Sequence, residues 1–418
     1  MTVSHAVLAT VLCAVTLVSS APNAHPLSPV TLPVEAFSPL IAQKVLATAN
    51  TLLSPAQYPQ YTDRIEGTWQ WFSPDTWTTG FFPSTLYALN ARSTLCSKDS
   101  GNLKETDWLE LGRTWSAAEV PLETHTGVGH DVGFLSYPFM DELVVNTHNA
   151  TAVTAVNNFA KELAARFSPI VGCTRSWDSA DPTDFQVIID NMMNLQVLFA
   201  SADLNGNDTL RQIAISHARK TAINHIRPDG GSFHVVDYNS TTGKVIDRRT
   251  SQGYANNSTW SRGQAWGIYG FANSSSFSCQ VFTIIHMPRY CAVYKQTNLS
   301  EFLQVSRHMA AYFLDHLPKD GIVPWDFNAP LSPPRPADTS AATIASMAFL
   351  LLAQQELAQQ PTNTTGANLY VDAAVRLLQT TTALAWKPSW RSLLSNGTVN
   401  NPAQNNLTGI VYGTSVFF

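Results

Sequence analysis

One carboxylate, Asp190, stands alone in an apolar stretch that reads Ile-Ile-Asp-Asn-Met-Met-Asn from Ile188 to Asn194. Burying an unpaired carboxylate costs free energy unless a site uses it, so Asp190 is a candidate catalytic acid. The spacing predicts a helix in which Asp190 and Asn194 share one face. The alternative is a buried helix N-cap, because Asp is favoured at that position. The residues alone leave both roles open.

A second acid lies in the segment Gly129-His130-Asp131-Val-Gly-Phe134. Its glycines permit tight turns, so the segment either places His130 and Asp131 in a site or forms a plain turn. Aromatic and cationic side chains follow downstream: Trp260, Arg262 and Trp266. An arginine between tryptophans needs an anion or a stacking partner. Stacking surfaces and a fixed cation are the equipment for holding an acidic sugar.

The elements that must position these residues are mostly helices. Apolar residues recur every three or four positions in the segments 153–167, 302–313 and 371–378, which is typical of amphipathic helices facing a common core. The clearest strands are Ser232–Tyr238 and Lys244–Arg248, which Asn-Ser-Thr-Thr-Gly joins as a hairpin. Helices separated by long loops favour an all-α toroid, with function carried on loops at one end.

The composition excludes some classes of partner. The chain has 418 residues, a net charge of −5 and only 13% charged residues. Since no basic stripe supplies an electrostatic footprint, we expect no nucleic-acid partner. Neither Cys-x-x-Cys nor His-Glu-x-x-His occurs, so we predict no metal and no cofactor. The length alone suggests two or three domains, although barrels often run longer as one unit. We expect a monomer.

The N-terminus has the features of a secretory signal peptide. Residues 6–18 form an apolar run that small residues follow, and this run is too short to span a membrane comfortably. We therefore predict a signal peptide at 1–20 and a secreted, extracellular protein over 21–418. No later run reaches transmembrane length, so we expect no membrane partner. Roughly ten Asn-x-Ser/Thr sequons predict a glycoprotein. Four cysteines remain after cleavage, and their pairing cannot be deduced from sequence: Cys96, Cys173, Cys279 and Cys291.

The order of these motifs resembles glycoside hydrolase family 88, the unsaturated glucuronyl hydrolases. The resemblance runs from about Gln70 to Leu352 and more faintly to Tyr412. It implies a single (α/α)6 barrel over 21–418 with a small β-hairpin excursion. It also implies that Asp190 and Asp131 are the catalytic acids. The sugar-binding residues that it implies are Trp77, His130, Trp177, His234, Gln252, Arg262 and Trp266.

Several of these residues also have a structural interpretation. A Trp on an apolar face is more often part of the core than a sugar platform. His234, on a predicted strand, is also explained as a structural histidine. Asp338 resembles a family element too, but we expect it to act only as a helix cap.

The implied substrate is the unsaturated uronic acid at the non-reducing end of lyase-generated oligosaccharides. Protonation of C4 in its C4=C5 vinyl ether creates an oxocarbenium-like centre at C5, which water attacks. The hemiketal then opens and releases the neighbouring sugar. Asp190 would donate the proton, and its ordinary pKa of about 3.9 must be raised by apolar neighbours and Asp131. Two alternatives stay open: an unsaturated rhamnogalacturonyl hydrolase acting on pectin fragments, and a non-catalytic glycan-binding relative.

The segment 273–290 departs from the family pattern because it lacks a helical period and contains an exposed apolar stretch. Either it is a real loop stapled by a Cys279–Cys291 disulfide, or it is an unspliced intron, which we favour. In both cases we expect the chain to leave the helix after Trp266 and to re-enter it near Cys291. The sequence after Tyr412 also departs from the family, which would leave part of the barrel wall uncovered.

Overall fold

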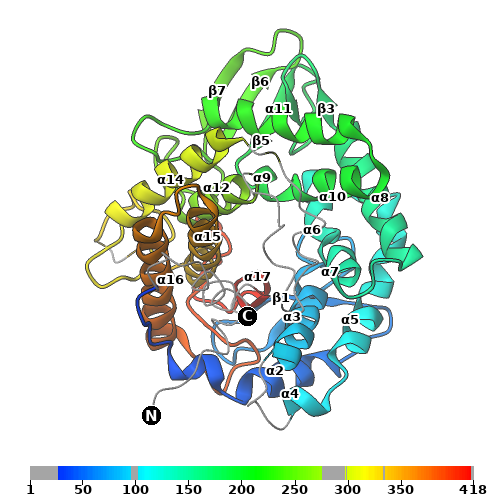
Figure 1. Cartoon of the computed structure of the whole chain (residues 1–418), viewed down its shortest axis with the longest axis vertical. Helices are drawn as coiled ribbons and strands as arrows, with labels where there is room; N and C mark the ends of the chain where they lie inside the picture. Colours follow the sequence, from blue (N-terminus) through cyan, green and yellow to red (C-terminus); the bar gives the residue numbers. More distant parts are fainter. Residues whose placement is uncertain (1–26, 96–101, 275–296, 298, 333–334, 416–418) are drawn as a thin grey trace.

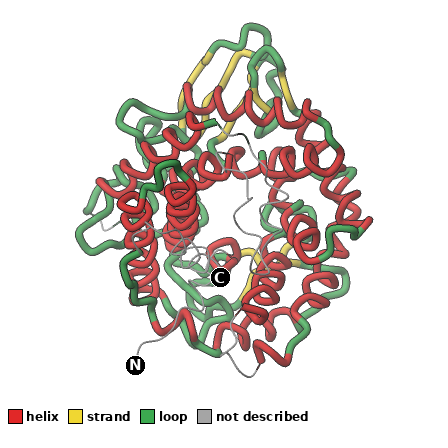
Figure 2. Tube along the Cα trace, in the orientation of Figure 1, coloured by secondary structure: helices red, strands yellow, loops and turns green. Residues whose placement is uncertain are grey.

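The helices form a closed ring of two layers around a common centre (Figure 1). Along the chain, outer and inner helices alternate, and the strands are confined to short pieces (Figure 2). The computed structural model describes residues 27–95, 102–274, 297, 299–332 and 335–415.

The inner layer lines the centre of the ring. It consists of α3 (Phe81–Leu95), α7 (Tyr137–Val145), α10 (Gln196–Asn205), α12 (Ser261–Ser274), α15 (Thr339–Ala358) and α17 (Val411–Ser415). The outer layer consists of α2 (Leu40–Ala49), α5 (Trp108–Ser116), α8 (Ala150–Ala165), α11 (Asp208–Asn224), α14 (Ser300–Asp315) and α16 (Thr364–Ala385). Within the described residues this makes six outer–inner pairs, and α17 closes the ring by contacting both α15 and α3. The architecture is the expected (α/α)6 barrel.

Short helical turns connect the layers. They are η1 (Val34–Phe37), α4 (Asn102–Glu105), η2 (Ala117–Glu123), η3 (Gly129–Asp131), α6 (Val132–Leu135) and α9 (Asn191–Asn194). Two of them, α6 and α9, pack against each other on the inner side of the ring.

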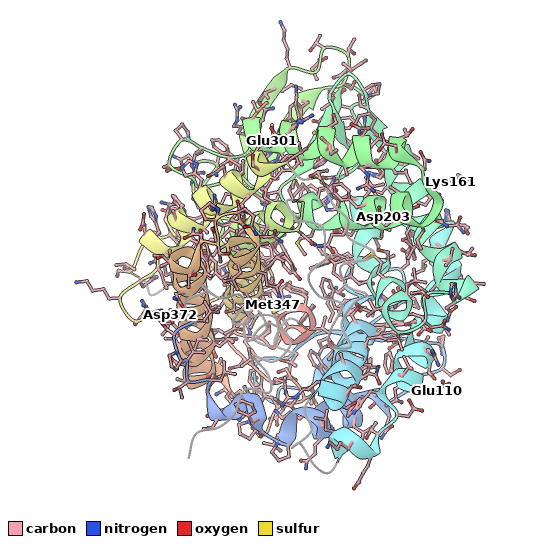
Figure 3. The ribbon with its side chains drawn as sticks, in the orientation of Figure 1. Glu110, Lys161, Asp203, Glu301, Met347 and Asp372 are labelled. Atoms are coloured by element: carbon pink, nitrogen blue, oxygen red, sulfur yellow. The ribbon has the colours of Figure 1, made fainter. Side chains whose placement is uncertain are left out.

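The predicted amphipathic helices are confirmed, and α8 shows why they form. Its buried face repeats at three- and four-residue steps through Val156, Phe159 and Leu163, so one stripe enters the core. Asn149 caps the start of the helix, because its Oδ1 accepts hydrogen bonds from the backbone N–H groups of Thr151 and Ala152. The outer face is polar: Glu110, Lys161 and Asp372, labelled in Figure 3, are exposed on α5, α8 and α16.

Helix α15 corrects one expectation from the sequence. Its 20 residues are long and apolar enough to cross a membrane by length and composition alone. However, 67% of its most apolar stretch is buried, and it contacts α12 and α16. Its apolar side chains therefore pack the interior of the ring.

The predicted hairpin is confirmed as β6 (Val235–Asn239) and β7 (Val245–Arg249), with Gly243 in the left-handed region at φ +66°. A third strand, β5 (Asp184–Ile188), pairs with β6. This corrects the reading of Ile188 as helical, because the strand runs up to it. The remaining strands form two small sheets: β1 (Tyr58–Thr62) with β2 (Trp69–Phe72), and β3 (Phe167–Ser168) with β4 (Cys173–Thr174).

Helix α12 also differs from expectation. It continues to Ser274, so the chain does not leave the helix after Trp266, and residues 273 and 274 of the atypical segment are helical. Residues 275–290 and the signal peptide at 1–20 lie outside the described residues. Cys173 is buried as a free thiol, whereas Cys96, Cys279 and Cys291 also lie outside the described residues, so the proposed disulfide stays a prediction.

Candidate active site

Asp190 lies where β5 ends and α9 begins, at the N-cap position. Its side chain accepts no capping hydrogen bond, and its Oδ1 atom is buried without a partner among the described residues. The carboxyl group occupies the cap position but does not cap the helix. Burial raises its pKa to about 7; His130 and Arg262 oppose this shift, and the Asp131 carboxylate reinforces it. The structural alternative of an ordinary N-cap is therefore wrong.

Asp131 occupies the same kind of position at the start of α6, again without a capping hydrogen bond. His130 Nε2 lies 3.0 Å from Asp131 Oδ1. The histidine is 2% exposed, whereas the Asp131 side chain is 15% exposed. His130 thus orients a carboxylate that remains accessible, and the pair lies near enough to Asp190 to act on its charge.

The two short helices that carry these acids are joined by Asn194. Its Oδ1 accepts the backbone N–H of Phe134 at 2.9 Å, and its Nδ2 lies 3.4 Å from the carbonyl of Asp190. Gly133 allows this approach, because a Cβ atom there would lie 2.5 Å from the Cα of Asn194. The glycine and the asparagine therefore fix the spacing between α6 and α9.

His234 faces the same region from the start of β6. Its Nδ1 accepts the backbone N–H of Ser251 at 3.1 Å and lies 3.4 Å from the N–H of Gln252. These contacts place the ring proton on Nε2, which is buried with no partner among the described residues. Burial, aided by Arg262, lowers the pKa of His234 to about 3. The ring is therefore a neutral donor whose N–H is available to a ligand.

Aromatic rings surround His234. Trp177 meets it edge-on at 6.2 Å between ring centroids, and Trp260 lies at 4.4 Å on another side. The Arg262 guanidinium lies 4.6 Å from the Trp260 ring. Trp260 therefore lies between His234 and Arg262, in contact with both.

Arg262 has the anion and the stacking partner that its sequence context required, but they belong to the protein and not to a bound sugar. Its Nη1 donates to Asp338 at 2.8 Å and to the carbonyl of Thr398, and its Nη2 donates to Gln252 Oε1 at 2.7 Å and the carbonyl of Val399 at 2.7 Å. Its side chain is 2% exposed and that of Asp338 is fully buried. The guanidinium holds the 398–399 loop and Gln252 in place, so both of its Nη groups are already occupied. Asp338 is the N-cap of α15, as predicted, and is also the arginine's counter-ion.

Trp266 and Trp77 belong to an aromatic wall. Trp266 is 1% exposed, and Trp77 is half-buried. Both contact Tyr412 of α17, at 6.5 Å and 4.9 Å between ring centroids. Phe81 and Phe134 complete the wall. For Trp266 the geometry is that of a core residue, and its contact with sugar stays a prediction.

Sequence reasoning did not identify Tyr412 as a site residue. Burial raises the pKa of its hydroxyl, with Arg262, Asp338 and Asp190 acting on it electrostatically. The Arg262 guanidinium lies 5.4 Å from its ring. The only signal in the sequence was its position at the end of the family resemblance.

The structure brings the predicted site residues into one connected cluster. Salt-bridge, hydrogen-bond, ring and electrostatic contacts, some running through Tyr412, link Trp77, His130, Asp131, Trp177, Asp190, His234, Gln252, Arg262 and Trp266. Within the described parts of the chain, no group of three or more His, Cys, Asp or Glu side chains is arranged to hold a metal ion. A buried acid near pKa 7, a second carboxylate and an uncharged donor make proton transfer to a bound sugar feasible.

Comparison with known proteins finds related enzymes. No family model matches the chain. An unsaturated glucuronyl hydrolase of Formosa agariphila is 33% identical over 357 residues, covering 82% of this chain and 78% of the relative. The unsaturated glucuronyl hydrolase of Bacillus sp. strain GL1 is 29% identical, covering 67% of each chain.

Solved structures give the same result. The crystal structure of an unsaturated glucuronyl hydrolase specific for heparin superposes with a TM-score of 0.76 at 27% identity, covering 92% of this chain and 94% of that one. The Bacillus sp. GL1 enzyme, at 23% identity and a TM-score of 0.75 over 90% of this chain and 92% of that one, shares the fold. The chain therefore belongs to the unsaturated glucuronyl hydrolases, glycoside hydrolase family 88.

Proposed function

We propose that this glycosidase removes the 4-deoxy-hex-4-enuronosyl residue from the non-reducing end of lyase-generated oligosaccharides by hydrating its C4=C5 bond. The observation that carries the proposal is the Asp190 carboxyl group, which does not cap its helix and whose pKa is raised to about 7 by burial. A carboxyl with that pKa is protonated in part near neutrality, as a general acid must be.

The chemistry needs one proton and one water molecule. The Asp190 carboxyl gives its proton to C4, and the electrons of the C4=C5 bond form the new C4–H bond. The positive charge then spreads over C5 and the ring oxygen. Water adds to C5, and its proton passes to the Asp190 carboxylate, which restores the acid. The C5 hemiketal opens, and the bond to the neighbouring sugar breaks with release of its hydroxyl group.

The remaining side chains bind and orient the sugar. His234 offers its Nε2–H, and the Gln252 amide offers its Nε2 group as a donor, since Arg262 already occupies Oε1. Asp131, oriented by His130, places a second carboxylate beside Asp190. This charge favours the protonated acid before the reaction and stabilises the cationic centre afterwards. Trp177 and Trp77 provide ring surfaces beside these polar groups.

The relatives favour the glucuronyl over the rhamnogalacturonyl alternative. Besides the two enzymes above, an unsaturated chondroitin disaccharide hydrolase of Streptococcus agalactiae is 30% identical over 217 residues, covering 52% of this chain and 50% of that enzyme. We propose unsaturated glycosaminoglycan disaccharides as the substrate class.

The experiment compares an unsaturated chondroitin disaccharide with its saturated counterpart. Loss of the ultraviolet absorbance of the double bond should occur with the first, and no hydrolysis should occur with the second. Asp190→Asn should lower kcat by about 10²–10⁴-fold and leave KM nearly unchanged, since it removes the proton and keeps the shape. Comparable turnover of the saturated sugar, or a loss below about tenfold in Asp190→Asn, would contradict the proposal.

We further propose a secreted, monomeric glycoprotein that is processed after residue 20 and binds neither membranes nor nucleic acids.

Three asparagines of Asn-x-Ser/Thr sequons are helix N-caps, and they differ in whether the side-chain Nδ2 group makes a hydrogen bond. Asn149 and Asn363 donate from Nδ2 to buried Glu142 and Glu356, whereas Asn207 is exposed and uses only its Oδ1, as a cap. Mass spectrometry of protein secreted from eukaryotic cells should find glycan on Asn207, and N-terminal sequencing should begin at Ala21.

A further inference from the structure

A pocket of ≈ 530 Å³ lies apart from the candidate catalytic acids, between the end of α11, strand β7 and helix α14. Its lining includes Phe233 and Arg248. Phe233 directly precedes His234, and Arg248 directly precedes Arg249, which binds Asp237. Because neighbouring residues of a strand point to opposite sides, Arg248 and Arg249 project from opposite faces of β7, and the pocket lies on the Arg248 face. Its volume falls within the range of about 300–1,000 Å³ that small-ligand sites occupy.

Two arginines flank the pocket, but only one has donors to spare. Both guanidinium groups lie over the ring of Phe233, Arg227 at 5.1 Å and Arg248 at 5.5 Å. Arg227 is occupied by the carbonyl groups of Ser232 and Ser258, by Thr259 and by Asp229. Arg248 donates only its Nε, to the carbonyl of Asn224 at 3.0 Å. Among the described residues neither Nη atom of Arg248 has a hydrogen-bond partner.

The rest of the lining suits a sugar ring. Ile223, 74% exposed, and Val305 supply an apolar wall, while the exposed His308 supplies a second polar group in the lining. A fixed guanidinium with open Nη donors recognises a carboxylate or sulfate in two-point geometry. An apolar wall beside that cation matches the C–H face of a pyranose better than a free inorganic anion.

We infer that this pocket is a second, non-catalytic site for an anionic saccharide, in which Arg248 holds a sulfate or carboxylate substituent. The inference does not depend on the proposed reaction, because none of the pocket residues belongs to the catalytic cluster. Such a site would hold a charged oligosaccharide on the enzyme while its end occupies the active site.

The test measures binding of a sulfated chondroitin disaccharide that is saturated at its non-reducing end and is therefore not a substrate under the proposed function. Ligand-observed NMR titration gives the Kd for wild type, Arg248→Ala and Ile223→Glu. Ile223→Glu adds a negative charge at an exposed rim position, so it keeps the test valid if Arg248→Ala folds poorly. Both substitutions should raise the Kd by at least about tenfold, while turnover of a small unsaturated disaccharide stays unchanged.

Matched controls separate this pocket from the rest of the surface. Arg219→Ala removes an arginine of α11 that lies outside the pocket and pairs with Glu301 at 2.9 Å (Glu301 is labelled in Figure 3). Leu369→Glu adds the same charge at a 53% exposed position on α16. Neither should change the Kd. The unsulfated disaccharide distinguishes a carboxylate from a sulfate as the bound group. Equal affinity in all variants, or binding of inorganic sulfate as tight as that of the sulfated sugar, overturns the inference.

Discussion

Removing the charge of Arg262 should destabilise the fold before it affects substrate binding. The guanidinium and its counter-ion Asp338 are almost completely buried, and deleting one partner of a buried ion pair costs about 3–5 kcal/mol. After Arg262→Met, the Asp338 carboxylate still accepts from Ser340 N at 3.0 Å, Ser340 Oγ at 2.6 Å and Thr398 N at 3.3 Å. We therefore expect the lower end of that range, about 3 kcal/mol, in the free energy of unfolding.

A double-mutant cycle tests whether the ion pair is the cause. Asp338→Asn removes the charge but retains a good N-cap for α15, and the double variant removes both charges. Urea unfolding followed by tryptophan fluorescence gives each free energy of unfolding from the midpoint and slope. The loss in the double variant should be smaller than the sum of the single losses by about 1 kcal/mol or more.

The opposite result would restore the role predicted from the sequence. If Arg262→Met leaves the urea midpoint unchanged and raises KM at least about tenfold, the guanidinium serves the substrate carboxylate. The assignment of Arg262 to the support of Asp338, Gln252 and the 398–399 loop would then be wrong.

Three further predictions follow from the site and its surroundings. Asp190 must be protonated to act as the acid, and its pKa is raised to about 7, so kcat/KM should fall as the pH rises through about 7. Asp131→Asn removes a carboxylate that raises this pKa and should move the fall in kcat/KM to lower pH. A pH profile that is the same in Asp131→Asn and wild type would contradict the electrostatic coupling between the two acids. Burial raises the pKa of Glu119 well above its usual value, and both its oxygens lack partners among the described residues. The unfolded chain therefore loses this proton near pH 4.3 while the folded chain keeps it, so wild-type stability falls as pH rises above that value. The urea midpoint of Glu119→Gln, measured relative to that of wild type, should therefore be higher near pH 8 than near pH 4. The same difference between variant and wild type at both pH values would refute this prediction. Gly133→Ala should displace Asn194, whose Cα lies 2.5 Å from the added Cβ, and reduce kcat by about 10²-fold; wild-type kinetics would show that α9 tolerates the shift.

The candidate acids could be recognised in the sequence because their signals are local. Asp190 interrupts an apolar run, and His130 and Asp131 lie between glycines. Helical periods likewise predicted α8, α14 and α16, and turn residues predicted the hairpin of β6 and β7. The family resemblance supplied the architecture that periodicity alone could not.

Other features depend on partners that are distant in sequence. Arg262 could be recognised as needing an anion, but its anion is Asp338, 76 residues away, and no local pattern links the two. Strand β5 was missed because a short apolar run fits a strand and a buried helix equally well. Tyr412 reaches the site only because α17 closes the ring.

That closure also bears on the order of folding. Gly409 donates its N–H to Thr62 Oγ1 at 2.8 Å across 347 positions of sequence, and α17 meets α3 in the same seam. Contacts so distant along the chain carry a high loop-closure cost and form late. A chain on the ribosome acquires both acids long before it acquires Tyr412, because domains emerge from the N-terminal side. Sealing the seam therefore completes the barrel and the aromatic wall in one step, and a chain stopped before Val411 would carry the candidate acids without Tyr412, the ring of the wall that contacts both Trp77 and Trp266.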